Sequence, residues 1–452
     1  MKDKTDTAVF PNTRRPRRLL LAAAIFHLAV TITIYGLGRY AILPGTFDTH
    51  GIAMSFAQDG IEDHADVTLL SEMVTRGQIR DWATAPYPFH LKLYSICFAV
   101  FGSLFGFTII SAEPLNALCY LAILVLVFKL AQEAFNRRAG WIAAATVSLW
   151  PSFLLHTTQL LKDPLFLVGM LGFILVDLQL LSRSLSWPKA LLTGASAGLI
   201  SVFIWLARDN MGELLLATAA LGAAMLIARQ VREKQVQATN LVGMALAIVV
   251  SVSVTQVIPK FRKPDALRGA ALERRAAPPS NPGLPIAARV GTIRQRFISQ
   301  YPNSSSNLDS QVQLNSTVDL IRYLPRAAAI GFFAPFPNMW FATGKQVGSG
   351  GRLLSGLETI AKYVVEGLAV VGLWGKGRKR RAGQGFSAGF LGLVAAMGLI
   401  SLGLVVVNVG ALYRLRYVFL FLLIILAAEG AAQTLDWCRK KRADRGRLVA
   451  DA

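Results

Sequence analysis

The sequence predicts an all-α, polytopic membrane protein with about ten transmembrane helices. Of its 452 residues, 54% are hydrophobic and only 16% are charged, whereas soluble globular chains carry about 25% charged residues. Apolar runs recur along the chain at the length that a membrane-spanning helix needs, about 20 residues. Cys97, Cys119 and Cys438 are widely separated, so neither a disulfide framework nor a zinc site is expected.

The predicted spans follow one another from end to end. The first, residues 19–37, comes directly after a basic stretch and has no small-residue cleavage site at its end, so we interpret it as an uncleaved span rather than a signal peptide. It contains His27, which we expect to be a helix-packing partner. The other spans are residues 115–131, 141–155, 164–181, 190–206, 213–227, 241–258, 360–374, 386–407 and 418–432.

The basic residues predict a multi-pass protein of the inner (plasma) membrane with both termini in the cytoplasm. Residues 91–110 are also apolar but contain Lys92 and Tyr94, and we interpret them as a helix on the membrane surface. With that choice, the basic clusters of the short connections all fall on the side of the N-terminus, as the positive-inside rule requires. These clusters lie within residues 2–18, 137–138, 183–189, 229–234, 376–381 and 439–447.

Three parts follow from this topology. Residues 1–258 contain seven spans and a first outer loop at 40–112, for which interfacial helices are expected. Residues 259–357 form a long extracytoplasmic loop between spans seven and eight. Its segment 318–340 is apolar but interrupted by prolines, which favours a re-entrant or interfacial helix. Residues 358–452 contain three spans and a basic cytoplasmic tail.

Acidic side chains gather in the first outer loop. Asp63 and Asp66 precede apolar positions at helical spacing, and Asp48 lies further upstream. Such residues commonly complement a helix dipole at its N-terminus. Alternatively, a carboxylate that is partly buried at a lipid-facing cleft can act as a general base. All three residues are therefore candidate bases.

Further charged residues stand at the predicted outer ends of spans. Asp163 precedes Pro164, an arrangement typical of a helix start, yet a charge at this depth is functional by default. Lys92, Arg208, Arg414 and Arg416 could bind a phosphate, because arginine forms paired hydrogen bonds with it. For Arg208 the alternative is an ion pair with Asp209 at the interface, and for the other three cations it is snorkelling to ordinary lipid headgroups.

The order of these pieces resembles that of the type C glycosyltransferases, which include protein mannosyltransferases and lipid A aminoarabinose transferases. The resemblance covers residues 19–230. It consists of one span, an acidic outer loop, a Pro-rich entry at residues 86–88 into a surface helix, the Arg137-Arg138 turn, and Asp163 before a proline. It implies a type C glycosyltransferase architecture and a sugar donor linked to polyprenyl phosphate.

The resemblance also implies roles for the candidate residues. Asp63, followed by Gly77 after a hydrophobic helix, best fits the family's catalytic acidic residue. It would act as the general base and deprotonate the acceptor hydroxyl in an inverting transfer, with Asp48 and Asp66 as rival candidates. Asp163 would orient the acceptor, the donor sugar or a divalent cation, whose participation stays open. The phosphate charge would be stabilised by the four cations Lys92, Arg208, Arg414 and Arg416.

The expected partners are the lipid-linked donor, a glycan, lipid or protein acceptor, and membrane lipids. Two other functions stay open. One is a polysaccharide polymerase or O-antigen ligase, which would use a polyprenyl-diphosphate glycan and for which Arg322 and Arg326 are candidate contacts. The other is a lipid or glycan transporter. Nucleic acid binding is excluded, because the basic residues are divided among short loops rather than assembled into a groove.

Overall fold

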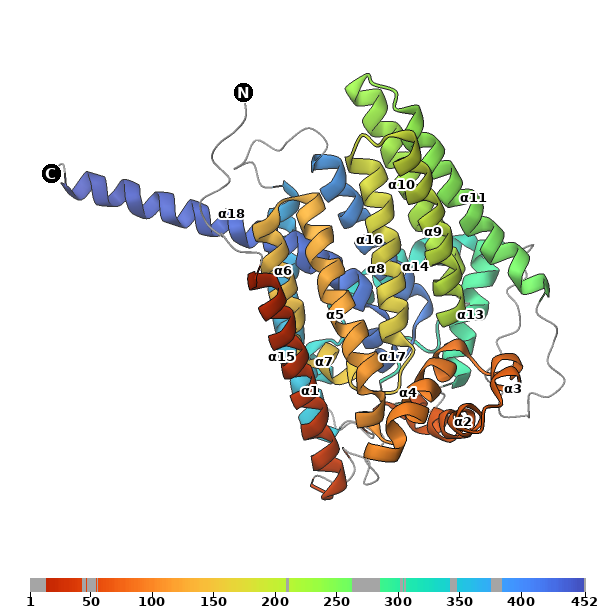
Figure 1. Ribbon diagram of the computed structural model, residues 1–452. Helices are drawn as coiled ribbons and strands as arrows, with labels where there is room; N and C mark the ends of the chain where they lie inside the picture. The colour runs from red at the N-terminus through yellow and green to blue at the C-terminus, as the bar shows by residue number, and fades with distance from the viewer. Residues whose placement is uncertain are drawn as a thin grey trace.

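A computed structural model confirms the prediction of an all-α membrane protein (Figure 1). It describes residues 14–42, 46, 54, 56–208, 211–261, 285–300, 304, 306–341, 348–374 and 384–450. Within these ranges there is no strand, and Asn307 and Asn408 form an isolated antiparallel β-bridge.

Seven helices of the described chain are long and apolar enough to cross a membrane. Each coincides with a predicted span, which confirms a multi-pass membrane protein. These helices are α1 (Arg14–Arg39), α5 (Ile109–Ala134), α8 (Asp163–Ser182), α9 (Trp187–Ala207), α10 (Gly212–Glu233), α16 (Gln384–Val405) and α18 (Tyr417–Ala450).

The other three predicted spans have different fates. The run 141–155 is broken into α6 (Arg137–Ser148) and α7 (Pro151–Thr157), because a residue before proline disfavours the helical conformation. At 1.5 Å per residue α6 is about 18 Å long, well short of a bilayer core of about 30 Å. The remaining two runs form α11 (Ala238–Phe261) and α15 (Gly348–Trp374).

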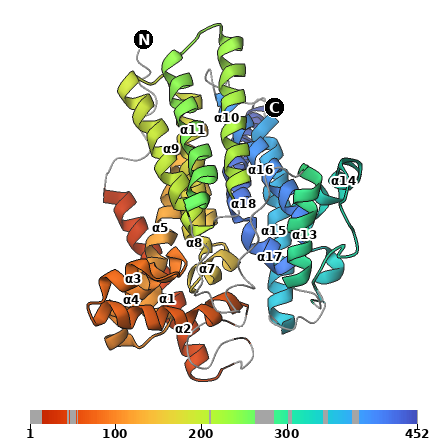
Figure 2. The same ribbon diagram turned by 90° about the vertical axis from the view of Figure 1, so that its right-hand side faces the viewer.

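α8 and the first half of α18 form the centre of the bundle. Residues 417–430 of α18 are all buried. α9, α10 and α11 lie side by side along one flank (Figure 2). Glycine permits some of these helices to approach closely. A Cβ at Gly194 of α9 would lie 2.4 Å from the carbonyl oxygen of Gly243 of α11. The apolar runs therefore pack backbone against backbone as well as through side chains.

The first helix is joined to the bundle by a buried polar network. His27 Nδ1 lies 2.7 Å from Glu113 of α5, and its Nε2 lies 2.9 Å from Thr157 of α7. Thr31 donates to the other Glu113 oxygen at 2.7 Å. This geometry confirms His27 as a helix-packing residue. His27 and Thr31 together pair both oxygens of the Glu113 carboxylate.

Three helices between α1 and α5 lie together at one end of the bundle, at the lower right of Figure 1. They are α2 (Gln58–Thr75), α3 (Ile79–Thr84) and α4 (Phe89–Phe105). The apolar run 91–110 is not one helix, since α4 ends before Gly106, where φ is 70°. α4 packs on α2 and α5, so it brings these three helices against α5.

The long loop before α15 contains helices of its own. α13 (Ile286–Gln300) and α14 (Thr317–Phe333) precede a 3-10 turn at Pro337–Met339. The predicted interfacial helix at 318–340 corresponds to α14, which ends before Pro335. Arg294 of α13 is 1% exposed and donates to the carbonyls of Asp309 (2.7 Å) and Leu404 (2.9 Å). The buried guanidinium therefore fastens this loop to the end of α16.

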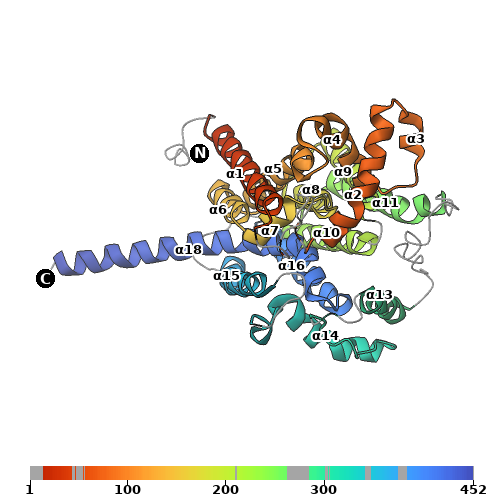
Figure 3. The same ribbon diagram turned by 90° about the horizontal axis from the view of Figure 1, so that it is seen from below.

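Seen from below, α18 extends far outside the bundle (Figure 3). It is preceded by α17 (Val409–Leu415), most of whose residues are buried. α17 leads directly into α18 and is held by Asn408, whose side chain accepts a hydrogen bond from the Ala411 N–H. α17 therefore reaches the same region as α7 and the start of α8.

Candidate functional site

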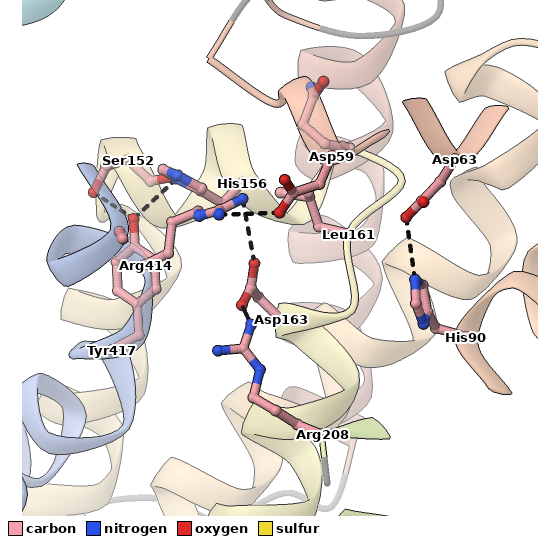
Figure 4. Close-up of polar contacts among 12 residues, drawn as sticks. Asp59, Asp63, His90, Ser152, His156, Leu161, Asp163, Arg208, Arg414 and Tyr417 are labelled. Carbon is pink, nitrogen blue, oxygen red and sulfur yellow. Dashed lines mark hydrogen bonds and ion pairs between the residues drawn. The ribbon is translucent and has the colours of Figure 1, made fainter. Parts of the chain in front are cut away.

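Charged side chains from four separate parts of the chain meet around Asp163 (Figure 4). Asp163, the first residue of α8, is 4% exposed. Its Oδ1 is 2.5 Å from Nη2 of Arg208, which follows α9, and its Oδ2 is 3.9 Å from Nη1 of Arg414 on α17. Arg414 Nη2 also binds Asp59 of α2 at 3.1 Å. Asp163 therefore holds two arginines that approach it from different elements.

The turn between α7 and α8 fixes the position of Asp163. Pro164 stands in the first turn of α8, where its missing N–H costs no hydrogen bond. The Tyr94 hydroxyl lies 2.8 Å from Asn116 Oδ1 and 3.1 Å from the Leu161 carbonyl oxygen. The Gln159 side chain accepts a hydrogen bond from the Met54 N–H at 2.8 Å. The carboxylate thus stands on a turn held from three sides.

Asp63 of α2 lies beside this cluster and is 7% exposed. His90, at the start of α4, donates from Nε2 to the Asp63 carboxylate at 3.3 Å. Burial lowers the pKa of His90, although the neighbouring Asp63 opposes this shift. The ring is therefore neutral at pH 7 and acts as a hydrogen-bond donor that orients the Asp63 carboxylate.

Lys162 connects the two parts of the site. Burial and the charge of Arg208 lower the pKa of Lys162, whereas Asp59, Asp163 and Asp63 raise it. A single ammonium group therefore experiences the field of the carboxylates of both α2 and α8. Lys162 is therefore coupled electrostatically both to Asp63 and to the ion pairs of Asp163.

Three cations and three carboxylates gather around Asp163. The cations are Lys162, Arg208 and Arg414, and the carboxylates are Asp59, Asp163 and Asp63, the last of which acts on Lys162. Arg208 Nε is buried and has no hydrogen-bond acceptor within the described part of the chain. Three neighbouring cations and an unused N–H donor in a poorly solvated place favour an anionic ligand.

His156 of α7 borders the cluster and has a defined tautomer. Its Nδ1 is 2.6 Å from the Ser152 carbonyl oxygen, which can only accept, so Nδ1 carries the proton and Nε2 has a lone pair. Burial lowers the pKa of His156 to about 4, and the charge of Arg414 acts in the same direction. The Tyr417 hydroxyl, 3.0 Å from Nδ1, braces the ring. His156 is thus a neutral base beside Arg414 and Asp163.

Sequence reasoning placed Asp63, Asp163, Arg208 and Arg414 among the candidates, and the structure brings these four together. Sequence reasoning did not single out Asp59, His90 or His156. His90 lies two residues after Pro88, at the Pro-rich entry to α4, and this is the one signal that could have drawn attention to it. Asp59 and His156 have no such signal, because their roles depend on contacts with α17 and α18, which lie far away in the sequence.

The other candidates from the first loop are not part of this cluster. Asp66 of α2 is partly exposed, and burial together with the charge of Asp63 raises its pKa. Lys92 of α4 donates to the Ala83 carbonyl at 2.7 Å, so it closes the end of α3. Burial lowers the pKa of Lys92. Asp48 lies outside the described residues.

Arg416 is engaged elsewhere. It is 2% exposed, its Nη1 donates to the Ala334 carbonyl at 2.5 Å, and its guanidinium lies 4.0 Å from the Tyr413 ring centroid. Lys362 of α15 donates to the same carbonyl at 3.1 Å. Both cations therefore neutralise the carbonyl end of α14, a favourable position for positive charge.

The described residues contain no group of three or more His, Cys, Asp or Glu side chains that could hold a metal ion. Comparison with known proteins adds no family: no family model matches the chain, and no curated protein matches its sequence. The function is therefore argued from the chemistry of the site.

Proposed function

We propose that the protein is an integral membrane glycosyltransferase that moves a sugar from a polyprenyl-phosphate donor to a lipid, glycan or protein acceptor. The proposal rests on the Asp163 cluster, where Lys162, Arg208 and Arg414 gather beside an oriented Asp63 and the buried Nε of Arg208 has no acceptor among the described residues. The order of sequence motifs, which resembles that of type C glycosyltransferases, supports the same class. We further propose an architecture of that type with about ten membrane crossings, one of which α6 and α7 make together, with both termini cytoplasmic, in the inner (plasma) membrane.

The position of the cluster suits a lipid-linked phosphate. Asp163 begins α8 and Arg208 follows the last residue of α9, both of which are candidate spans. A phosphate at these helix ends would lie at the extracytoplasmic membrane surface, while its polyprenyl chain would stay in the bilayer. Arg208, Arg414 and Lys162 would stabilise the negative charge that grows on the departing phosphate. Asp163 would orient the two arginines rather than touch the substrate.

Asp63 is the proposed general base. The acceptor hydroxyl would give its proton to Asp63 while its oxygen forms a bond with the anomeric carbon. The bond between that carbon and the phosphate oxygen breaks, and polyprenyl phosphate leaves with the electron pair. Attack from the face opposite the phosphate inverts the anomeric configuration. His90 would keep the carboxylate oriented through its hydrogen bond.

Sugar transfer by the full-length protein in proteoliposomes tests this function. A panel of radiolabelled sugars on polyprenyl phosphate and glycans on polyprenyl diphosphate would be offered with a crude envelope acceptor. We expect transfer from a single-phosphate donor, a loss of at least about 100-fold in Asp63→Asn, as for a missing general base, and normal activity in the control Asp81→Asn, an exposed residue of α3.

Three outcomes would contradict the proposal. Full activity of Asp63→Asn would remove Asp63 as the base, and a loss confined to Asp66→Asn would assign that role to Asp66. Turnover of diphosphate-linked glycans alone would indicate a polymerase or ligase. Movement of an intact lipid-linked sugar across the membrane without cleavage would indicate a transporter.

A further inference from the structure

The end of α18 is a second charged feature, separate from the site around Asp163. Residues 417–430 are buried in the bundle, whereas residues 434, 435 and 437–444 are exposed. The exposed part continues the same helix and projects away from all other helices (Figures 1 and 3). It is therefore a helical surface that packing within the chain does not explain.

Residue types change in a fixed order along this projecting part. After the buried apolar segment come Leu435, 50% exposed, and Trp437, 61% exposed. Four consecutive exposed cations follow: Arg439, Lys440, Lys441 and Arg442. Because successive residues of a helix are about 100° apart, four in a row encircle it, so some of them face a neighbouring surface whichever way the helix is rotated. In Figure 1 this part of α18 runs at a large angle to α5 and α8.

The acidic residue at the root of this segment is already neutralised. Asp436 accepts from Arg138 Nη1 at 2.9 Å, which ties α18 to the start of α6. Lys441 Nζ lies 5.0 Å from the Trp437 ring centroid, so the indole and the ammonium group share one face. The exposed cations beyond Asp436 thus keep a strong net positive charge.

We propose that residues 437–442 of α18 bind anionic phospholipid headgroups of the leaflet from which the helix emerges. Tryptophan is typical of the membrane interface, and cations next to a membrane attract anionic headgroups. Because the projecting part leaves the bundle sideways (Figures 1 and 3), it would run along the membrane surface, where Trp437 and some of the encircling cations reach the headgroups. This lipid contact would hold the end of α18 at the membrane surface.

Lipid binding to the full-length protein tests this proposal. The protein in a neutral detergent would be titrated with phosphatidylglycerol or phosphatidylcholine, and bound lipids would be counted by native mass spectrometry. The test variant replaces all four cations with glutamine. The matched control removes four exposed cations elsewhere: Lys189, Arg232, Lys234 and Arg322.

We expect the wild type to prefer phosphatidylglycerol, and the test variant to bind it at least about tenfold more weakly, since each basic residue near an anionic surface contributes on the order of 1 kcal/mol. The control should retain most of its affinity, and salt should weaken binding in the wild type. Unchanged thermal unfolding would show that the test variant folds. Equal affinity of the wild type for both lipids, or equal losses in both variants, would overturn the proposal and indicate a soluble acidic partner for this helix instead.

Discussion

Asp163 shows how one buried residue organises its surroundings. Its carboxylate is almost fully enclosed and is balanced by Arg208 at 2.5 Å and by Arg414 at 3.9 Å. Removal of one partner from a buried ion pair leaves an uncompensated charge, which costs far more than the intact pair contributes. The stability of this region and its affinity for anions therefore depend on the same three side chains.

Arg208→Gln should consequently destabilise the protein by about 3 kcal/mol. The double variant Asp163→Asn/Arg208→Gln should recover part of this loss, because the unpaired carboxylate is then absent. Denaturant unfolding in detergent measures both effects. Arg76→Gln is the control, since Arg76 and Glu72 form an exposed pair whose removal should cost less than about 1 kcal/mol. Strictly additive effects of the two substitutions would contradict the coupling.

His156 makes a prediction about pH. Its pKa is about 4 in the folded protein and about 6.5 when unfolded. Between these values the unfolded chain binds a proton at this position and the folded protein does not, so the free energy of unfolding falls as the pH falls from 6.5 to 4. His156→Gln should have a shallower decline in melting temperature over this range, whereas His64→Gln should follow the wild type. Identical pH profiles for wild type and His156→Gln would refute this assignment.

At the residue scale, sequence could identify charges at the ends of apolar runs, because a charge at that depth is unusual whatever the fold. Asp163, Arg208 and Arg414 were found in this way. Asp59 could not be found, since its importance comes from Arg414, 355 positions away. Arg416 illustrates the reverse case: its pattern matched that of Arg414, but only the fold reveals that its guanidinium serves the end of α14.

At the scale of elements, helix packing depends on glycines at a few crossings. α15 and α18 approach so closely that a Cβ at Gly372 would lie 2.0 Å from the Leu426 carbonyl oxygen, and one at Gly430 would lie 2.0 Å from that of Leu368. Leu426 belongs to α18 and Leu368 to α15. Each of the two glycines therefore lets its own helix approach the backbone of the other at the same crossing.

Gly372→Ala should therefore separate α15 from α18 and lower the melting temperature by several degrees, as expected for a destabilisation of about 1–3 kcal/mol. Gly367→Ala is a control in the same helix, because a Cβ there would meet no atom within 4 Å. It should leave stability unchanged or raise it slightly through its better helix propensity. Equal melting temperatures for the two variants would show that the crossing does not depend on Gly372.

Element boundaries were predictable where apolar composition alone determines them, as in α8, α9 and α16. The run 141–155 was misread as one continuous helix because its composition is apolar throughout, while Pro151 starts a separate helix, α7. α4 and α5 show a related effect, since Gly106 adopts a positive φ and divides one apolar run into two helices. The special backbone preferences of proline and glycine thus decided what hydropathy could not.

At the scale of the whole molecule, the all-α membrane fold follows from composition, but the assembly of the site does not. α2, the α7–α8 turn, the end of α9 and α17 come from distant parts of the chain, and only packing of the bundle brings them together. The resulting arrangement keeps the Asp63–His90 pair and the arginine cluster as neighbours. The proposed transfer reaction needs a general base, Asp63, next to the cations that stabilise the departing phosphate.

The most direct test of the proposed function is whether the arginine cluster binds a polyprenyl phosphate. A polyprenyl phosphate with a photoreactive group next to the phosphate would be cross-linked to the full-length protein in proteoliposomes, and the labelled peptides identified by mass spectrometry. Arg208→Lys/Arg414→Lys keeps both charges but loses the planar guanidinium geometry that matches phosphate.

We predict labelling of peptides that contain Asp163, Arg208 or Arg414, competition by unlabelled polyprenyl phosphate but not by the corresponding alcohol, and at least about tenfold weaker labelling in the double variant. Labelling that is equal in the wild type and the double variant, or that the alcohol competes away equally well, would contradict a phosphate site at this cluster.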